Sequence, residues 1–130
     1  MTLTPSIPPI VRTIATIAAV AILIACGDPK YQPPAIVVTF SSSFPPPATL
    51  STGATIGIAA VVTNGPDNAT VNFTCVPAGE CGTFTPNPIA SNTPTTYQAP
   101  PAVPAGNSVT ITATSVTDTT KSVSAMITIN

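Results

Sequence analysis

The chain has 130 residues, of which only 5% are charged, and its formal net charge is −1. Nucleic-acid binding needs clustered lysine and arginine, so three cations in the whole chain exclude a nucleic-acid partner. There is no histidine to act as a general base or a zinc ligand, and the acidic residues are far apart in the sequence. We therefore expect a protein that is not an enzyme and that has no metal site and no cofactor. The acidic residues are Asp28, Asp67, Glu80 and Asp118.

The first informative stretch is residues 14–25, the uncharged apolar run IATIAAVAILIA, which follows Arg12 and ends at Cys26. A helix that crosses a bilayer needs about 20 apolar residues, and this run is shorter. Its length and position are typical of the apolar region of a secretory signal peptide. An uncleaved membrane anchor is disfavoured by the length, whereas an ordinary cleaved signal that leaves Cys26 as a free thiol stays open.

The last four residues of this stretch, Leu23-Ile24-Ala25-Cys26, resemble the lipobox of bacterial lipoproteins. The resemblance implies that residues 1–25 are a cleaved signal peptide. It also implies that Cys26 carries diacylglycerol and an acyl chain such as palmitate, so that a lipid anchor holds the protein on the membrane. Gly27, in place of Asp, implies export to the outer membrane or cell surface. The expected location is the bacterial cell envelope.

Residues 26–35 (CGDPKYQPPA) contain three prolines and predict a short, extended tether between the lipid and the folded domain. The remaining residues, 36–130, are enough for one domain. Prolines break any long helix there, and many of the polar residues are threonines, which suit the solvent face of a strand.

Residues 36–130 predict an all-β domain of about seven strands. The clearest pattern is in residues 108–115 (SVTITATS) and 121–130 (KSVSAMITIN), where apolar and polar side chains alternate. A hairpin with one apolar face needs a second sheet to cover it, so we expect a β-sandwich. The other predicted strands are residues 36–40, 54–63, 70–75, 81–85 and 95–98.

Two cysteines remain beside Cys26, and they lie six positions apart, at 75 and 81. In an exported chain such a pair predicts a disulfide, Cys75–Cys81, and the intervening Pro-Ala-Gly favours a hairpin-like loop. Closing so short a loop stabilises the fold by about 2 kcal/mol. A zinc site is the alternative, but two thiols without histidine lack ligands.

Five motifs stand out along the predicted strands: Val71-x-Phe73-x-Cys75, Cys81-Gly82-Thr83-Phe84, Thr96-Tyr97-x-Ala99-Pro100, Val109-x-Ile111-x-Ala113 and Val123-x-Ala125-x-Ile127-x-Ile129. Through these motifs the domain resembles the bacterial immunoglobulin-like domains. The resemblance implies an immunoglobulin-like β-sandwich whose core contains Phe73. We also expect the ring of Tyr97 to be packed and its hydroxyl to hydrogen-bond to the backbone.

The fold leaves two functions open, because β-sandwich domains occur in proteins with many different functions. The first is a membrane-anchored, extracytoplasmic lipoprotein with a structural or protein-interaction role. The alternative is a glycan- or peptide-binding (adhesion) module of the cell envelope, with an envelope protein or a glycan as partner. An exposed cluster of Phe40, Phe44 and Phe84 would favour the alternative, because sugar rings stack on aromatic side chains. A smooth surface of threonine and serine would favour the first function.

Overall fold

The structure is a computed structural model that describes residues 32–130. The predicted signal peptide (residues 1–25), the predicted lipidation site Cys26 and most of the tether lie outside the described residues. Pro33–Asn130 form one unit. The described residues contain ten strands and no helix, so none of the described residues forms a helix that could cross a membrane. The strands are β1 Val37–Phe40, β2 Thr49–Leu50, β3 Thr55–Ile58, β4 Ala60–Thr63, β5 Thr70–Val76, β6 Thr83–Thr85, β7 Ile89–Ala90, β8 Thr95–Gln98, β9 Ser108–Ser115 and β10 Ser122–Ile129.

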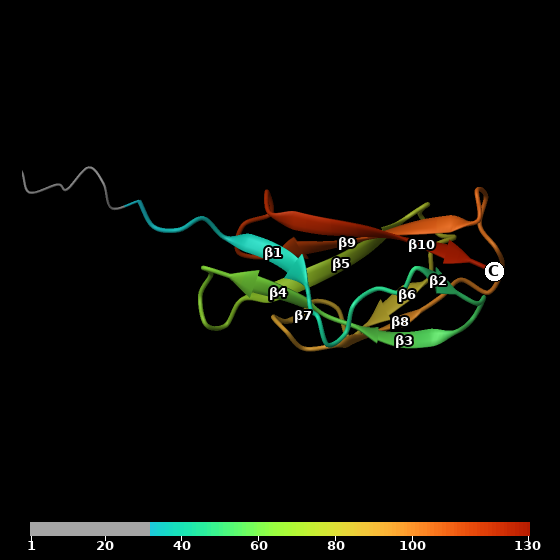
Figure 1. Cartoon of the computed structure of the whole chain (residues 1–130), viewed down its shortest axis with the longest axis horizontal. Helices are drawn as coiled ribbons and strands as arrows, with labels where there is room; N and C mark the ends of the chain where they lie inside the picture. Colours follow the sequence, from blue (N-terminus) through green and yellow to red (C-terminus); the bar gives the residue numbers. More distant parts are fainter. Residues whose placement is uncertain (1–31) are drawn as a thin grey trace, which may run out of the picture. The chain divides into compact units, whose positions relative to one another are not determined.

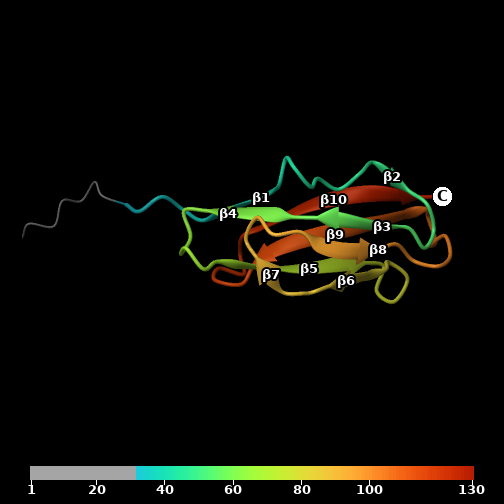
Figure 2. The ribbon, with the colours of Figure 1, turned by 90° about the horizontal axis from the view of Figure 1, so that it is seen from below.

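The strands form a β-sandwich, which confirms the predicted all-β class. One layer is a five-stranded sheet in the order β2-β10-β9-β5-β7. The other layer holds the three-stranded sheet β3-β8-β6 and the antiparallel pair β1-β4. Figure 1 shows the two layers facing each other, with β9 and β10 in one and β3, β4 and β8 in the other, and Figure 2 views the domain from the side of β3, β4 and β8.

Alternating side chains build the core between the layers, as the sequence pattern predicts. In β9, Val109, Ile111 and Ala113 are buried, while the threonines between them face outward. In β5, Val71 and Phe73 are buried in the same way. The period of two puts one apolar face of each strand against the opposite layer. The buried hydrophobic cluster is completed by Val38, Ile58, Ala60, Cys81, Tyr97, Ala99, Ile127 and Ile129.

The single strand predicted over residues 54–63 is wrong: the segment is two strands, β3 and β4, which belong to different sheets. The break is at Ala59, whose N–H donates to the carbonyl of Phe44 (3.0 Å) and whose carbonyl accepts from the N–H of Ser41 (2.9 Å). The bond from Ser41 continues the β1–β4 register by one position, whereas the bond to Phe44 leads to the loop after β1, so Ala59 takes no part in the β3–β8 ladder. Ile58, Ala59 and Ala60 are all buried, so the alternation that suggested one strand stops here.

The predicted hairpin-like loop around the two cysteines is also wrong. β5 pairs with β9 and β7, whereas β6 pairs with β8 in the opposite sheet. The segment between β5 and β6 therefore crosses from one layer to the other instead of turning back beside β5. Two short strands, β2 and β7, lie in segments that the sequence pattern assigns to loops.

Candidate functional site

The ionisable side chains of the described residues are dispersed over separate turns. Asp67 lies between β4 and β5, Glu80 between β5 and β6, and Asp118 with Lys121 between β9 and β10. Within residues 32–130, no group of three or more His, Cys, Asp or Glu could hold a metal ion. The described carboxylates are therefore not brought together in one cleft.

Asp118 has a structural role in its turn. Its Oδ1 accepts hydrogen bonds from the hydroxyl (2.6 Å) and the N–H (3.0 Å) of Thr120. These bonds lower the pKa of Asp118, because they stabilise its ionised form, and the charge of Lys121 adds to the effect. This geometry is a side-chain turn of the kind that aspartate favours at the ends of hairpins.

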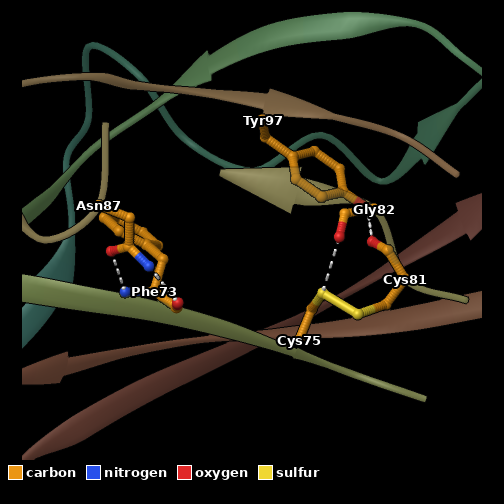
Figure 3. The surroundings of a disulfide bond; sticks show 6 residues. All are labelled: Phe73, Cys75, Cys81, Gly82, Asn87 and Tyr97. Atoms are coloured by element: carbon orange, nitrogen blue, oxygen red, sulfur yellow. Dashed lines mark hydrogen bonds between the residues drawn. A yellow bond between two sulfur atoms is a disulfide. The ribbon is translucent and has the colours of Figure 1, made fainter. Parts of the chain in front are cut away.

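The predicted disulfide is present at the point where the chain crosses between the layers. Cys75, at the end of β5, is bonded to Cys81, just before β6, with a Cα–Cα distance of 5.8 Å. Figure 3 shows the bond between β5 and the incoming segment of the opposite layer. Because β5 and β6 belong to different sheets, the disulfide fastens one layer of the sandwich to the other.

Tyr97 reinforces the same crossing from β8. Its hydroxyl donates a 2.6 Å hydrogen bond to the carbonyl oxygen of Cys81, and its side chain is fully buried, as the sequence predicts (Figure 3). Burial raises the pKa of Tyr97 because the charged phenolate would lose its hydration. The ring packs against Phe84, at 4.9 Å between centroids, and Phe84 stacks on Phe73 at 5.4 Å. A continuous aromatic row therefore links β8, β6 and β5 through the core.

Gly82 lets the segment that leads into β6 approach its sheet neighbour β8 closely beside this row. Its φ is +91°, and a Cβ there would collide with the backbone carbonyl of Gln98 and lie 3.0 Å from Cε2 of Tyr97. No other residue fits such a position without displacing β8. The Cys-Gly pair at 81–82 thus combines the covalent link between the layers with a close backbone approach to β8.

Asn87 is a residue whose role the sequence pattern misses. Its side-chain amide pairs with the backbone of Phe73 on both sides: Oδ1 accepts from the N–H and Nδ2 donates to the carbonyl, each at 2.8 Å (Figure 3). The amide thus continues the ladder that β7 makes with the first residues of β5. Unpaired strand edges promote aggregation, and this amide covers one. Its position between two prolines in the predicted loop gives no indication of that contact.

The three phenylalanines that could mark a glycan-binding surface do not form an exposed cluster. Phe84 belongs to the aromatic row, and Phe40 is partly buried against the core. Phe44 is 41% exposed and lies over Gly57, where a Cβ would be 3.6 Å from the ring. One phenylalanine on the surface is too small a platform for stacking a sugar chain.

The outer face of the five-stranded sheet carries hydroxyl groups and no charge. Along β9 it presents Thr110, Thr112 and Thr114, and the register places Ser124 of β10 beside Thr112. The hydroxyls of Thr112 and Ser124 are 2.8 Å apart and share a hydrogen bond. This Thr/Ser face also exposes Met126 (67%) and Val76 (57%) on either side of Thr110. Along β5, β9 and β10 it has no aromatic side chain on which a sugar could stack, which favours the first of the two predicted functions.

Two adjacent hollows lie at the end of the domain where β5, β8 and β10 end. The first, of about 270 Å³, is lined by Gly79, Glu80 and residues 100–104. The second, also of about 270 Å³, is lined by Gly53, Gly82, Thr83 and residues 98, 99 and 101. Pro101 borders both.

No protein-family model, curated protein or solved structure matches this chain significantly. The function is therefore argued from the residues and their geometry alone.

Proposed function

We propose that this chain is a bacterial lipoprotein that holds an immunoglobulin-like domain outside the cytoplasm, with a structural or protein-interaction role. In this proposal residues 1–25 are removed as a signal peptide, Cys26 is lipidated, residues 26–35 form the tether and residues 36–130 form the domain. The anchored domain lies in the cell envelope, at the outer membrane or cell surface. The observation that carries the proposal is the Cys75–Cys81 disulfide in a chain whose residues 14–26 resemble the leader and lipobox of a bacterial lipoprotein. Structural disulfides persist in oxidising compartments and are rare in the cytosol.

The strand arrangement supports the immunoglobulin-like identity. In that fold one sheet is built from the first, second, fifth and fourth strands and the other from the third, sixth and seventh. The order β3-β8-β6 with the pair β1-β4 follows the first pattern, and β10-β9-β5 follows the second. The first strand region is divided, since β1 pairs with β4 in one layer and β2 pairs in parallel with β10 in the other.

The surface supports a structural or protein-interaction role over glycan binding or catalysis. Among the described aromatic side chains, only Phe44 is a large exposed one, and the Thr/Ser face is uncharged. The described carboxylates belong to three different turns, and no three of them gather in one group, so nothing in their placement suggests catalysis.

The test of the anchor is metabolic labelling of producing cells with a fatty-acid analogue. Wild type should incorporate the label into the membrane fraction, and Cys26→Ser should not. The matched control is Cys75→Ser/Cys81→Ser, which removes the other thiols and should keep the label. Equal labelling of wild type and Cys26→Ser would end the lipoprotein proposal.

A further inference from the structure

The loops at one end of the domain form a fixed surface, called here the distal loop end. It consists of residues 51–54, 77–82 and 99–107, together with the end of β10. The chain enters the domain at the opposite end, where Val37 pairs with Thr63. Figure 1 shows β1 beginning at one end of the sandwich and the C-terminus at the other. A domain held through its N-terminal tether would therefore present the distal loop end to its surroundings.

Hydrogen bonds between the loops hold this surface in one shape. The N–H of Gly53 donates to the carbonyl of Pro100 (2.9 Å), and the N–H of Ala99 donates to the carbonyl of Ala54 (2.8 Å). Asn107 is joined to β10 through a 2.9 Å bond from the N–H of Ile129. The disulfide fixes the third loop. Because the loops are already ordered, a ligand loses little free energy in arranging them.

The two hollows of this end have the size of side-chain sockets. At about 270 Å³ each, they are smaller than the cavities that enclose a whole drug-sized ligand. They share Pro101 as a common border, so one bound chain could place a group in each. Val103, which lines the first hollow, is 46% exposed and adds apolar surface there.

The polar groups at this end favour a cationic hydrogen-bond donor. Residues 32–130 contain four charged side chains, and Glu80 is the one that lies at the distal loop end. The other three, Asp67, Asp118 and Lys121, lie in turns at the opposite end.

Residues 100, 101 and 104 are prolines, which have no N–H, so the loop has few donors. The carbonyls of Pro100 and Pro104 already accept from the N–H groups of Gly53 and Asn107, so the Glu80 carboxylate is the strongest acceptor at this end. The side chains of lysine and arginine have hydrogen-bond donors and no acceptors, so they complement a carboxylate beside a loop with few donors.

We propose that the distal loop end binds an extended segment of a partner protein in which an apolar side chain adjoins a lysine or an arginine. The apolar group lies against Val103 and the proline-lined hollow, and the cation lies beside Glu80. This inference rests on the protein-interaction role proposed above, and it names the surface and the chemistry of the partner.

The experiment is an NMR titration of the ¹⁵N-labelled full chain in detergent micelles with two synthetic peptides, acetyl-Ala-Phe-Arg-Ala-amide and acetyl-Ala-Phe-Glu-Ala-amide. The arginine peptide should shift the amide signals of Gly79, Glu80 and Val103, and the glutamate peptide should bind more weakly. Glu80→Gln should weaken the arginine peptide about two- to fivefold, as expected for one exposed ion pair. Val103→Ser should weaken both peptides about three- to tenfold through lost apolar contact.

The matched control is Asp67→Asn, which removes the same charge from the opposite end and should leave the affinity unchanged. The inference would be overturned if both peptides bound with equal affinity, or if Glu80→Gln and Asp67→Asn changed the affinity equally. Amide-signal shifts confined to the Thr/Ser face, or no shifts at all, would overturn it as well. The outcome is separable from the anchor: peptide binding with an unlabelled Cys26 would leave this surface standing and refute the lipoprotein. A labelled Cys26 without peptide binding would support the lipoprotein and refute the binding surface.

Discussion

Two glycines in one turn provide a matched measurement of how closely the segment that leads into β6 approaches β8. Gly79 and Gly82 both have positive φ, +81° and +91°. A Cβ on Gly79 would meet no atom within 4 Å, whereas a Cβ on Gly82 would collide with the carbonyl of Gln98 and press on the ring of Tyr97. Alanine at either position therefore has the same kind of backbone strain, but only alanine at 82 also forces β8 to move.

The magnitudes follow from these two costs. Placing an L-residue in the left-handed region costs about 1–2 kcal/mol. Overpacking against a fixed neighbour adds about 1–3 kcal/mol. Gly79→Ala should thus lower the free energy of unfolding by about 1–2 kcal/mol, and Gly82→Ala by about 2–5 kcal/mol. Domains of this kind are stable by about 5–15 kcal/mol, so we expect both variants to fold.

The assay is urea unfolding followed by circular dichroism, with wild type and both variants at one pH. Unchanged slopes against urea would show that the variants differ in stability and not in the extent of unfolding. Equal losses for the two substitutions would refute the close approach of Gly82 to β8, as would a larger loss for Gly79→Ala.

Three further predictions concern the aromatic row and the β9–β10 turn. Tyr97→Phe should lower the free energy of unfolding by about 1–3 kcal/mol in urea titrations, because the buried carbonyl of Cys81 loses its donor; no change would contradict that bond. Phe73→Ala should cost about 3–5 kcal/mol in the same assay, since the side chain is 2% exposed, and a loss below 1 kcal/mol would place Phe73 outside the core. The third concerns pH. Because the pKa of Asp118 is lowered in the folded protein, its contribution to stability is present above the unfolded pKa of about 3.9 and is lost as pH falls through the folded value. Asp118→Asn should therefore lose less stability than wild type between neutral pH and about pH 2 in thermal melts, and parallel pH profiles would contradict this.

Strong alternation allowed much of the fold to be predicted from the sequence. The segments that became β5, β9 and β10 have several apolar residues at a spacing of two, and each has its apolar face in the core. The Cys75–Cys81 disulfide and the hydrogen bond from Tyr97 to the backbone were likewise predictable. Two cysteines close in sequence without histidine have few other partners, and the hydroxyl of a buried tyrosine needs an acceptor.

The features that the sequence did not predict depend on distant partners. β2 and β7 have two residues each, too few for a period to be seen, and β2 exists because β10 lies beside it. The pattern over residues 54–63 continues through Ala59 in sequence, but hydrogen bonds to the 41–44 segment break the strand there. The same limit applies to Asn87, whose amide pairs with a strand 14 residues away.

The most direct test of the central proposal is intact-mass and N-terminal mass spectrometry of the protein isolated from the membranes of producing cells. The account predicts a mature chain that begins at Cys26, carries lipid on that residue and has Cys75 and Cys81 joined as a disulfide. A chain that retains Met1, or one that begins elsewhere and has no lipid, would contradict it.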